Sequence, residues 1–88
     1  MGNIEIKNDD DLCEHYHKDT FDVYWRGKKV EQATAMNFED LGQGYGKDNF
    51  DVFYKGVIIP KAQPFSFVVE NDGYAHDAFN VYYRGKKT

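Results

Sequence analysis

The sequence has little of what commonly stabilises or localises a chain of 88 residues. Cys13 is the single cysteine, so no disulfide can form within the chain. Leucine occurs only at Leu12 and Leu41, and no long helical periodicity is present, which disfavours a helical bundle. No apolar run approaches the roughly 20 residues of a membrane span, and no secretory leader is evident. These absences predict that the chain has no membrane segment and is located in the cytoplasm. The alternative, that a secretory leader was removed earlier, stays open.

Positive charge is also in the minority. The chain has 15 acidic and 11 basic residues, a formal net charge of -4. A general nucleic-acid-binding protein needs a basic field, so nucleic acid is an unfavoured partner. An acidic chain is better suited to a partner that is more basic than itself.

What the chain has in abundance is aromatic side chains, with seven Tyr, seven Phe and one Trp. Each aromatic buries a large apolar area, so even a short chain can build a core from them. Aromatic and β-branched side chains also fit the pleated surface of a strand. The composition therefore favours an all-β domain.

A repeat organises most of the sequence. Three ungapped segments begin at Tyr16, Tyr45 and Tyr74, 29 residues apart. All three follow the pattern Tyr-x-[Lys/His]-Asp-x-Phe-[Asp/Asn]-Val-aromatic-aromatic-[Arg/Lys]-Gly. We predict one domain over residues 1–88: an antiparallel meander of short hairpins from about two and a half copies of the 29-residue repeat, with a partial repeat at each end.

Within a copy, the pattern predicts short strands at 16–18, 23–26 and 28–31, with a turn at 19–22 and a hairpin turn at Arg26-Gly27. The link 32–37 has room for one helical turn, and Pro60 and Pro64 exclude a regular strand between them. Gly44 and Gly73 mark matching turns between copies. A further stretch, 3–7, is expected to be a strand that pairs with the last copy and covers an open edge.

The repeat resembles the DKNYY family of bacterial proteins, whose repeats read roughly Tyr-Ala-Lys-Asp-Lys-Asn-x-Val-Tyr-Tyr-x-Gly-Lys. The resemblance covers residues 16–88 and is specific in 45–48, in 81–83 and in the glycine that closes each hairpin. It implies a bacterial origin and a β-repeat, and it brings no catalytic residues. The chain departs at Phe21, Phe50 and Phe79, which are apolar where the family is polar. This departure bears on turn geometry and marks a specialised subgroup.

Strand alternation places the central residues of each copy on two faces. One face carries Val23 with Trp25 and its counterparts, and is predicted to be core. The other face pairs each aromatic with a cation, and we take it as the candidate partner-binding site: Tyr24, Arg26, Phe53, Lys55, Tyr82 and Arg84. The alternative is that the linkers fold over this face and cover it with Met36, Phe38, Phe65 and Phe67.

Other candidate sites are weaker. Asp19, Asp48 and Asp77 recur at equal spacing, which predicts three separate turn residues and not a catalytic pair. The segment 13–17 holds one Cys and two His, but a zinc site needs four ligands from two anchoring segments. Two Arg-Gly-Lys-Lys segments, 26–29 and 84–87, predict solvated hairpin tips, with an anion-binding edge as the alternative. We therefore predict no catalytic residue, no metal and no cofactor.

These observations predict a non-catalytic protein-binding module. A specific form is an inhibitor or immunity-type protein that neutralises a more basic bacterial or phage protein. Aromatic residues and arginine are favoured at protein-binding hot spots, which suits this reading. The alternative is a repeat that binds carbohydrate or a nucleic-acid strand on its aromatic side chains.

Overall fold

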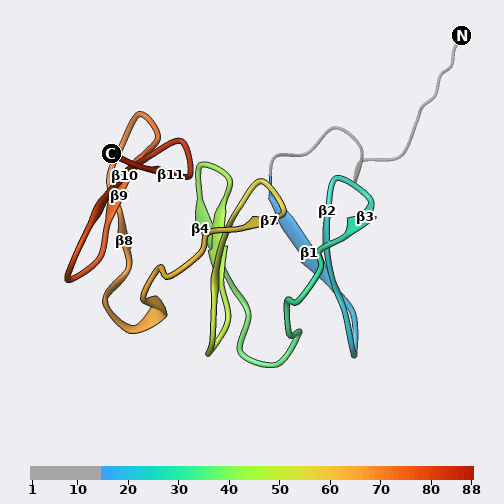
Figure 1. The fold of residues 1–88 in the computed structure, drawn as a ribbon. Coiled ribbons are helices and arrows are strands. Elements are labelled where there is room, and N and C mark those ends of the chain that lie inside the picture. The colour runs from blue at the N-terminus through green and yellow to red at the C-terminus, as the bar shows by residue number, and fades with distance from the viewer. Residues whose placement is uncertain (1–14) are drawn as a thin grey trace, which may run out of the picture.

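The computed structural model describes residues 15–88, which form three small antiparallel β-sheets in a row (Figure 1). The first sheet contains β1 (Tyr16–Lys18), β2 (Val23–Trp25) and β3 (Lys28–Lys29). The second contains β4 (Glu39–Gly42), β5 (Tyr45–Lys47), β6 (Val52–Tyr54) and β7 (Val57–Ile58). The third contains β8 (Val68–Val69), β9 (Tyr74–His76), β10 (Val81–Tyr83) and β11 (Lys86–Lys87).

Within each sheet the strands follow one another in chain order, each antiparallel to the next. The predicted all-β meander of short hairpins is therefore confirmed. The second and third sheets begin with β4 and β8, ahead of the repeat motif that starts at Tyr45 and Tyr74. The expected strand at 3–7 lies outside the described residues, so its pairing with the last copy stays a prediction.

Tight two-residue turns join the strands at one edge of the row. Arg26 and Gly27 have φ angles of 52° and 83°, and the same pair of positive φ angles recurs at 55–56 and 84–85. Two positive φ angles in succession define a type I′ hairpin turn, whose twist matches that of the flanking strands. The predicted hairpin at Arg26-Gly27 is confirmed, and it ends β2 at Trp25, one residue earlier than expected.

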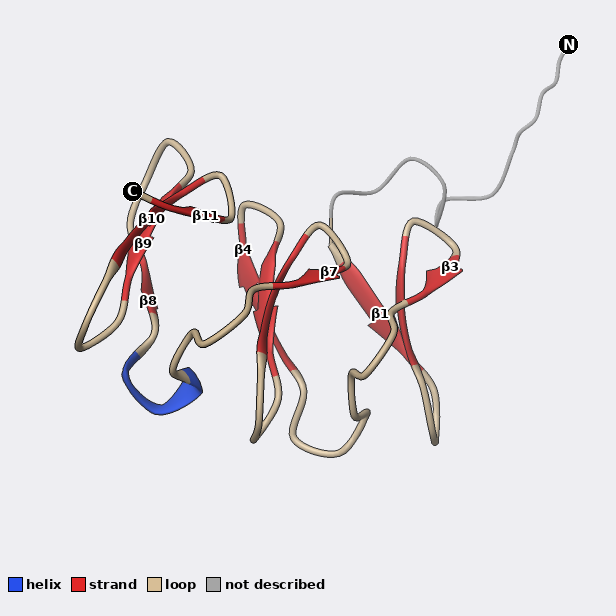
Figure 2. Ribbon diagram, viewed as in Figure 1, coloured by secondary structure: helices blue, strands red, loops and turns tan. Residues whose placement is uncertain are grey.

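Two linkers, 30–38 and 59–67, carry the chain from one sheet to the next. The first has no helical turn, whereas the second contains a 3₁₀-helix, η2 (Pro64–Ser66), drawn in blue in Figure 2. Proline suits the first position of a helix because the backbone N–H it lacks would have no partner there. The prediction that 60–64 holds no strand is confirmed.

The hydrophobic core lies between successive sheets, because a single small sheet has two faces and no interior. Each sheet has a forward face, which in the first carries Tyr16, Val23 and Trp25, and a backward face on the opposite side. The forward face of the first sheet packs with Phe38 of the linker and with Phe53 on the backward face of the second sheet. A second cluster joins the second and third sheets in the same way: Tyr45, Val52, Ile59, Ala62, Phe67, Ala75 and Tyr82.

This arrangement corrects the expectation of three exposed aromatic side chains on one face. Phe53 and Tyr82 are 0% and 1% exposed, because the preceding sheet and its linker cover them. Tyr24, the counterpart in the first sheet, is half-buried. The alternative of a linker covering this face holds for Phe38 and Phe67, which are buried. It does not hold for Met36 and Phe65, which point to solvent.

Candidate functional site

The first residue of each of the first two motif copies clamps one sheet to the next. The hydroxyl of Tyr16 donates a hydrogen bond to the carbonyl of Gly44 at 2.8 Å and accepts one from the amide of Gly56 at 3.0 Å. Tyr45 repeats both bonds in the next pair of sheets, to the carbonyl of Gly73 at 2.8 Å and from the amide of Gly85 at 2.9 Å. Each tyrosine therefore fixes two hairpin turns of the following sheet.

The third motif residue secures the linker that leaves its sheet. The Nζ atom of Lys18 donates to the carbonyls of Ala35 and Phe38, at 3.2 and 3.3 Å. Lys47 makes the equivalent bond to the carbonyl of Pro64 at 2.8 Å. The ammonium groups thus donate charge-assisted hydrogen bonds to linker carbonyls that have no strand partner.

The aspartate that follows shapes the turn at the other edge of each sheet. One oxygen of Asp48 accepts hydrogen bonds from the amides of Phe50 and Asp51, both at 2.8 Å. Asp19 and Asp77 make the same pair of bonds in their own turns, so the predicted turn role of all three aspartates is confirmed. This geometry uses the backbone of the phenylalanine and leaves its side chain outside the turn.

As a result, the phenylalanines of the three turns point into solvent. Phe21, Phe50 and Phe79 are 79%, 71% and 76% exposed. Met36 and Phe65, at matching positions of the two linkers, are 73% and 92% exposed. All five side chains belong to the turns and linkers at the lower edge of the row in Figure 1, and we call this set the Phe edge.

The Phe edge is acidic. Its three turns, with the residue before each, span 18–22, 47–51 and 76–80, and contain five aspartates and two lysines. Both lysines are engaged with linker carbonyls. Burial raises the pKa of Asp51, and the neighbouring charge of Asp48 adds to the effect. A carboxylate in that position is stabilised by a cation brought close to it.

The Phe edge is also hollowed between the second sheet and the two linkers. A depression of 310 Å³ opens there. Its lining residues come from the second sheet and its turn and from the two linkers: Asn37, Phe38, Glu39, Lys47, Asp48, Asn49, Pro64 and Phe65. Its lining combines apolar rings with carboxylates and amides. Such a surface accepts an apolar side chain flanked by polar or cationic groups.

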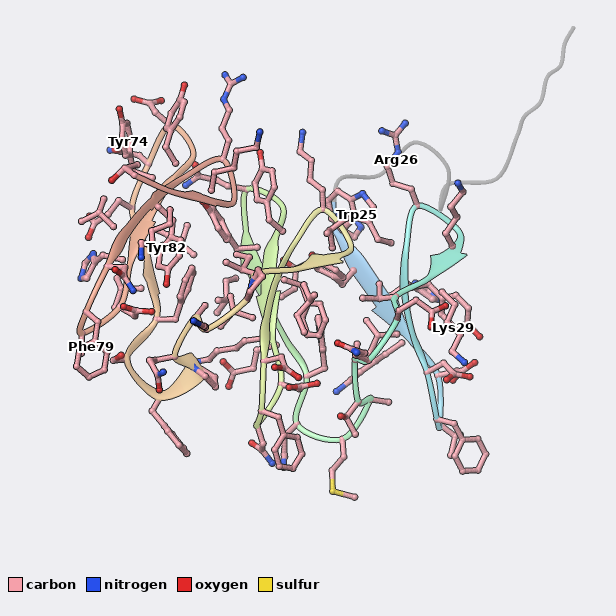
Figure 3. All side chains as sticks on the ribbon, viewed as in Figure 1. Trp25, Arg26, Lys29, Tyr74, Phe79 and Tyr82 are labelled. Carbon is pink, nitrogen blue, oxygen red and sulfur yellow. The ribbon has the colours of Figure 1, made fainter. Side chains whose placement is uncertain are left out.

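Three cations were predicted to lie beside the aromatic residues of the candidate site: Arg26, Lys55 and Arg84. They lie at the edge of the row opposite the Phe edge. Arg26 and Phe79 are at opposite edges in Figure 3, because Arg26 occupies a type I′ turn and not a strand. Lys55 and Arg84 occupy equivalent turns, and each lies over the forward-face tyrosine before it, 5.6 Å from the ring of Tyr54 and 5.3 Å from that of Tyr83. The six predicted residues therefore do not form one surface.

The remaining candidates fall in separate places. The three turn aspartates belong to three different sheets, so no two of them converge as an acid–base pair. Cys13 lies outside the described residues, and within 15–88 no three His, Asp or Glu side chains are close enough to share a metal ion. Over the same residues, no helix is long and apolar enough to cross a membrane.

Sequence reasoning noticed the three turn phenylalanines but did not place them in a site. The sequence did contain a signal for them, because Phe stands in all three copies at a turn position where the family pattern has a polar residue. The structure adds that this position needs only its backbone amide for the turn. Five large apolar side chains exposed along one edge mark that edge as a candidate interaction surface.

Comparison with known proteins agrees with the repeat. The model of the DKNYY family matches residues 3–86, nearly the whole chain. No curated protein and no solved structure matches the sequence or the fold.

Proposed function

The chain belongs to the DKNYY family, and from that premise we propose that it is a non-catalytic protein-binding module that uses the Phe edge. The observation that carries the proposal is the exposure of Phe21, Phe50 and Phe79, each above two thirds. Burying one such side chain contributes about 1.5–3 kcal/mol. The fold does not use this energy, and a bound partner would.

The partner we propose is a protein more basic than this chain. Five turn aspartates surround the phenylalanines, and the two nearby lysines are held by the linkers. A partner surface with apolar side chains flanked by arginine or lysine would match both features. An anionic membrane surface or a nucleic-acid backbone would meet repulsion here. An inhibitor that neutralises a basic bacterial or phage protein is one form that this binding would take.

The experiment compares two triple variants. The first replaces Phe21, Phe50 and Phe79 by Asn, the polar residue that stands at this position in the family pattern. The matched control replaces Arg26, Lys55 and Arg84 by Asn, which tolerates the positive φ angles of those turns. Each protein is used to capture partners from its host, and the captured protein is then titrated against wild type and both variants.

We expect the Phe-edge variant to bind the captured protein at least tenfold more weakly than wild type, about 1.4 kcal/mol or more. The control variant should bind within about threefold of wild type. Circular dichroism should show both variants folded, because neither set of side chains is buried. Equal binding by wild type and the folded Phe-edge variant would show that the partner binds elsewhere and would overturn the assignment of this edge.

A further inference from the structure

The forward face of the third sheet is exposed, unlike its two counterparts. Tyr16 and Val23 in the first sheet, and Tyr45 and Val52 in the second, are at most 9% exposed. In the third sheet the equivalent residues, Tyr74 and Val81, are 46% and 50% exposed. Strand register places two more large apolar residues on this face, Val68 at 47% and Tyr83 at 37%.

This face keeps the residues that form the interface in the earlier sheets. Tyr74 stands at the position of the clamping tyrosines Tyr16 and Tyr45, and within residues 15–88 its hydroxyl makes no hydrogen bond. Its ring packs at a tilt against that of Tyr83, with 4.6 Å between the ring centroids, as the ring of Tyr45 packs against that of Tyr54 at 4.8 Å. The side chains are therefore already arranged for an interface of the kind described between the other sheets.

The two existing interfaces define what would fit this face. The receiving sheet offers a carbonyl and an amide from two glycine turns, which the tyrosine hydroxyl bonds. It has a small residue opposite the tyrosine, Gly46 or Ala75, and a Cβ at Gly46 would lie 2.8 Å from the ring of Tyr16. It also places an aromatic ring, Phe53 or Tyr82, in the centre of the contact.

A second molecule of this chain does not offer that receiving surface in its first sheet. His15 stands where the second and third sheets have the turn glycines Gly44 and Gly73. His17 stands where they have Gly46 and Ala75. A side chain at the position of Gly46 meets the ring of Tyr16, so an imidazole at position 17 would occupy the space that the tyrosine ring requires. Gly44 and Gly73 have a positive φ, which favours glycine, so with His15 at this position the first sheet does not have the glycine turn of the other two.

From this repetition we infer that the forward face of the third sheet binds a β-sheet of the same repeat, supplied by another polypeptide. That sheet carries glycine at its turns, a small residue opposite Tyr74 and an aromatic residue beside Val81. The interaction surface is separate from the Phe edge, so either assignment can fail without the other.

The test supplies such a sheet on a second molecule of the full chain. Its first sheet is converted by His15→Gly, His17→Gly and Tyr24→Phe. Asp9→Phe is added because Asp9 aligns in sequence with Phe38 and Phe67. Val81→Asp in this donor blocks its own forward face, so that it cannot polymerise. Sedimentation velocity then measures complexes between the donor and wild type, up to about 100 µM of each protein.

We expect a one-to-one complex of donor with wild type, and at least about tenfold weaker binding to a V81D acceptor that is otherwise wild type. Absence of a complex with a folded donor would overturn the inference, and so would a complex that survives V81D in the acceptor. Self-association of the wild type that V81D abolishes would also overturn it, because the occupant would then be a second copy.

A covalent version keeps the inference testable if the donor does not fold. Residues 60–87 are repeated directly after Thr88, which continues the 29-residue register. We expect one cooperative unfolding transition with a higher denaturant midpoint than the parent chain, and loss of that increase when Val81→Asp is present. An unchanged midpoint in the extended chain would mean that the face does not accept a further sheet.

Discussion

At the residue scale, each motif aspartate in the second and third sheets divides its two oxygens between two tasks. One oxygen of Asp48 holds the amides of its own turn, and the other accepts the amide of Thr34 in the preceding linker at 2.8 Å. Asp77 bonds the amide of Gln63 in the same way at 3.0 Å. Within residues 15–88 Asp19 accepts no linker amide, and its second oxygen accepts the hydroxyl of Tyr24 at 3.2 Å in an exposed position. Within the described residues, Asp19 therefore stabilises only its own turn, whereas Asp48 and Asp77 each stabilise a turn and a linker.

We predict that Asp48→Ala destabilises the fold more than Asp19→Ala. Removing Asp48 leaves three partly buried amides without an acceptor, each costing about 1–3 kcal/mol if water does not replace it. Water can reach the amides that Asp19 leaves, because that turn is exposed. Urea unfolding of the two variants beside wild type measures the difference. Equal losses in the two variants would contradict the role of the linker contact.

The turn role of the aspartates was predictable from sequence, because an Asp side chain bonds the backbone next to it and needs no distant partner. The burial of Phe53 and Tyr82 was not. Alternation shows which side chains share a face of a strand, but not whether another sheet covers that face. That depends on the path of the linkers, and neither linker contains a regular element long enough to be read from its pattern.

At the scale of elements, the sheets are held together by side chains and not by strand pairing. No strand within residues 15–88 pairs with a strand of another sheet. The link is made by Tyr16 and Tyr45, whose rings lie in the core while their hydroxyls bond the glycine turns of the next sheet. Each hydroxyl therefore bonds two turns of the next sheet, and in the second interface the side-chain oxygen of Gln43 also accepts the amide of Gly73 at 2.7 Å.

We predict that Tyr45→Phe lowers the free energy of unfolding by about 1–3 kcal/mol, because the amide of Gly85 loses its acceptor and the carbonyl of Gly73 keeps only the amide of Arg84. Tyr74→Phe is the matched control, since it removes an equivalent hydroxyl that is not bonded within the described residues. It should change the stability by less than about 0.5 kcal/mol. Thermal and urea unfolding measure both. A loss in Tyr74→Phe as large as that in Tyr45→Phe would contradict the clamp.

At the scale of the whole molecule, each sheet contacts only its neighbours in the row. The core consists of two clusters, one between each successive pair of sheets. Stability in such an array is close to a sum over neighbouring interfaces. The repeat and the all-β class were readable from the 29-residue period. The division into separate sheets was not, because the period does not say which strands pair.

We predict that the array loses stability in acid. Hydrogen bonds from turn amides hold the pKa of Asp19 below its usual value. Burial raises the pKa of Asp77, but bonds from the amides of Gln63 and Phe79 outweigh it and hold that pKa low as well. At these two groups the unfolded chain binds more protons than the folded one below a pH of about 4. The stability that both ionised groups contribute is present above that pH and is lost as the pH falls through the folded-state pKa values.

Urea unfolding between neutral pH and pH of about 2.5 checks this dependence. The midpoint should fall steeply in the acid range. Asp77→Asn, which cannot ionise, should start from a lower midpoint at neutral pH and fall by less. If the variant loses stability in acid as steeply as wild type does, Asp77 is not a source of the pH dependence.

The opposite edges of the row also differ in charge, and this difference acts before any contact is made. Arginine and lysine occupy the hairpin tips at one edge, and aspartates surround the phenylalanines at the other. Such a separation gives the molecule an electric dipole across its width. A cationic protein diffusing nearby would turn the aspartate side toward itself, so encounters would be productive more often than chance allows. Added salt would slow this approach by screening the field, while the lifetime of the complex, set by buried rings, would change little.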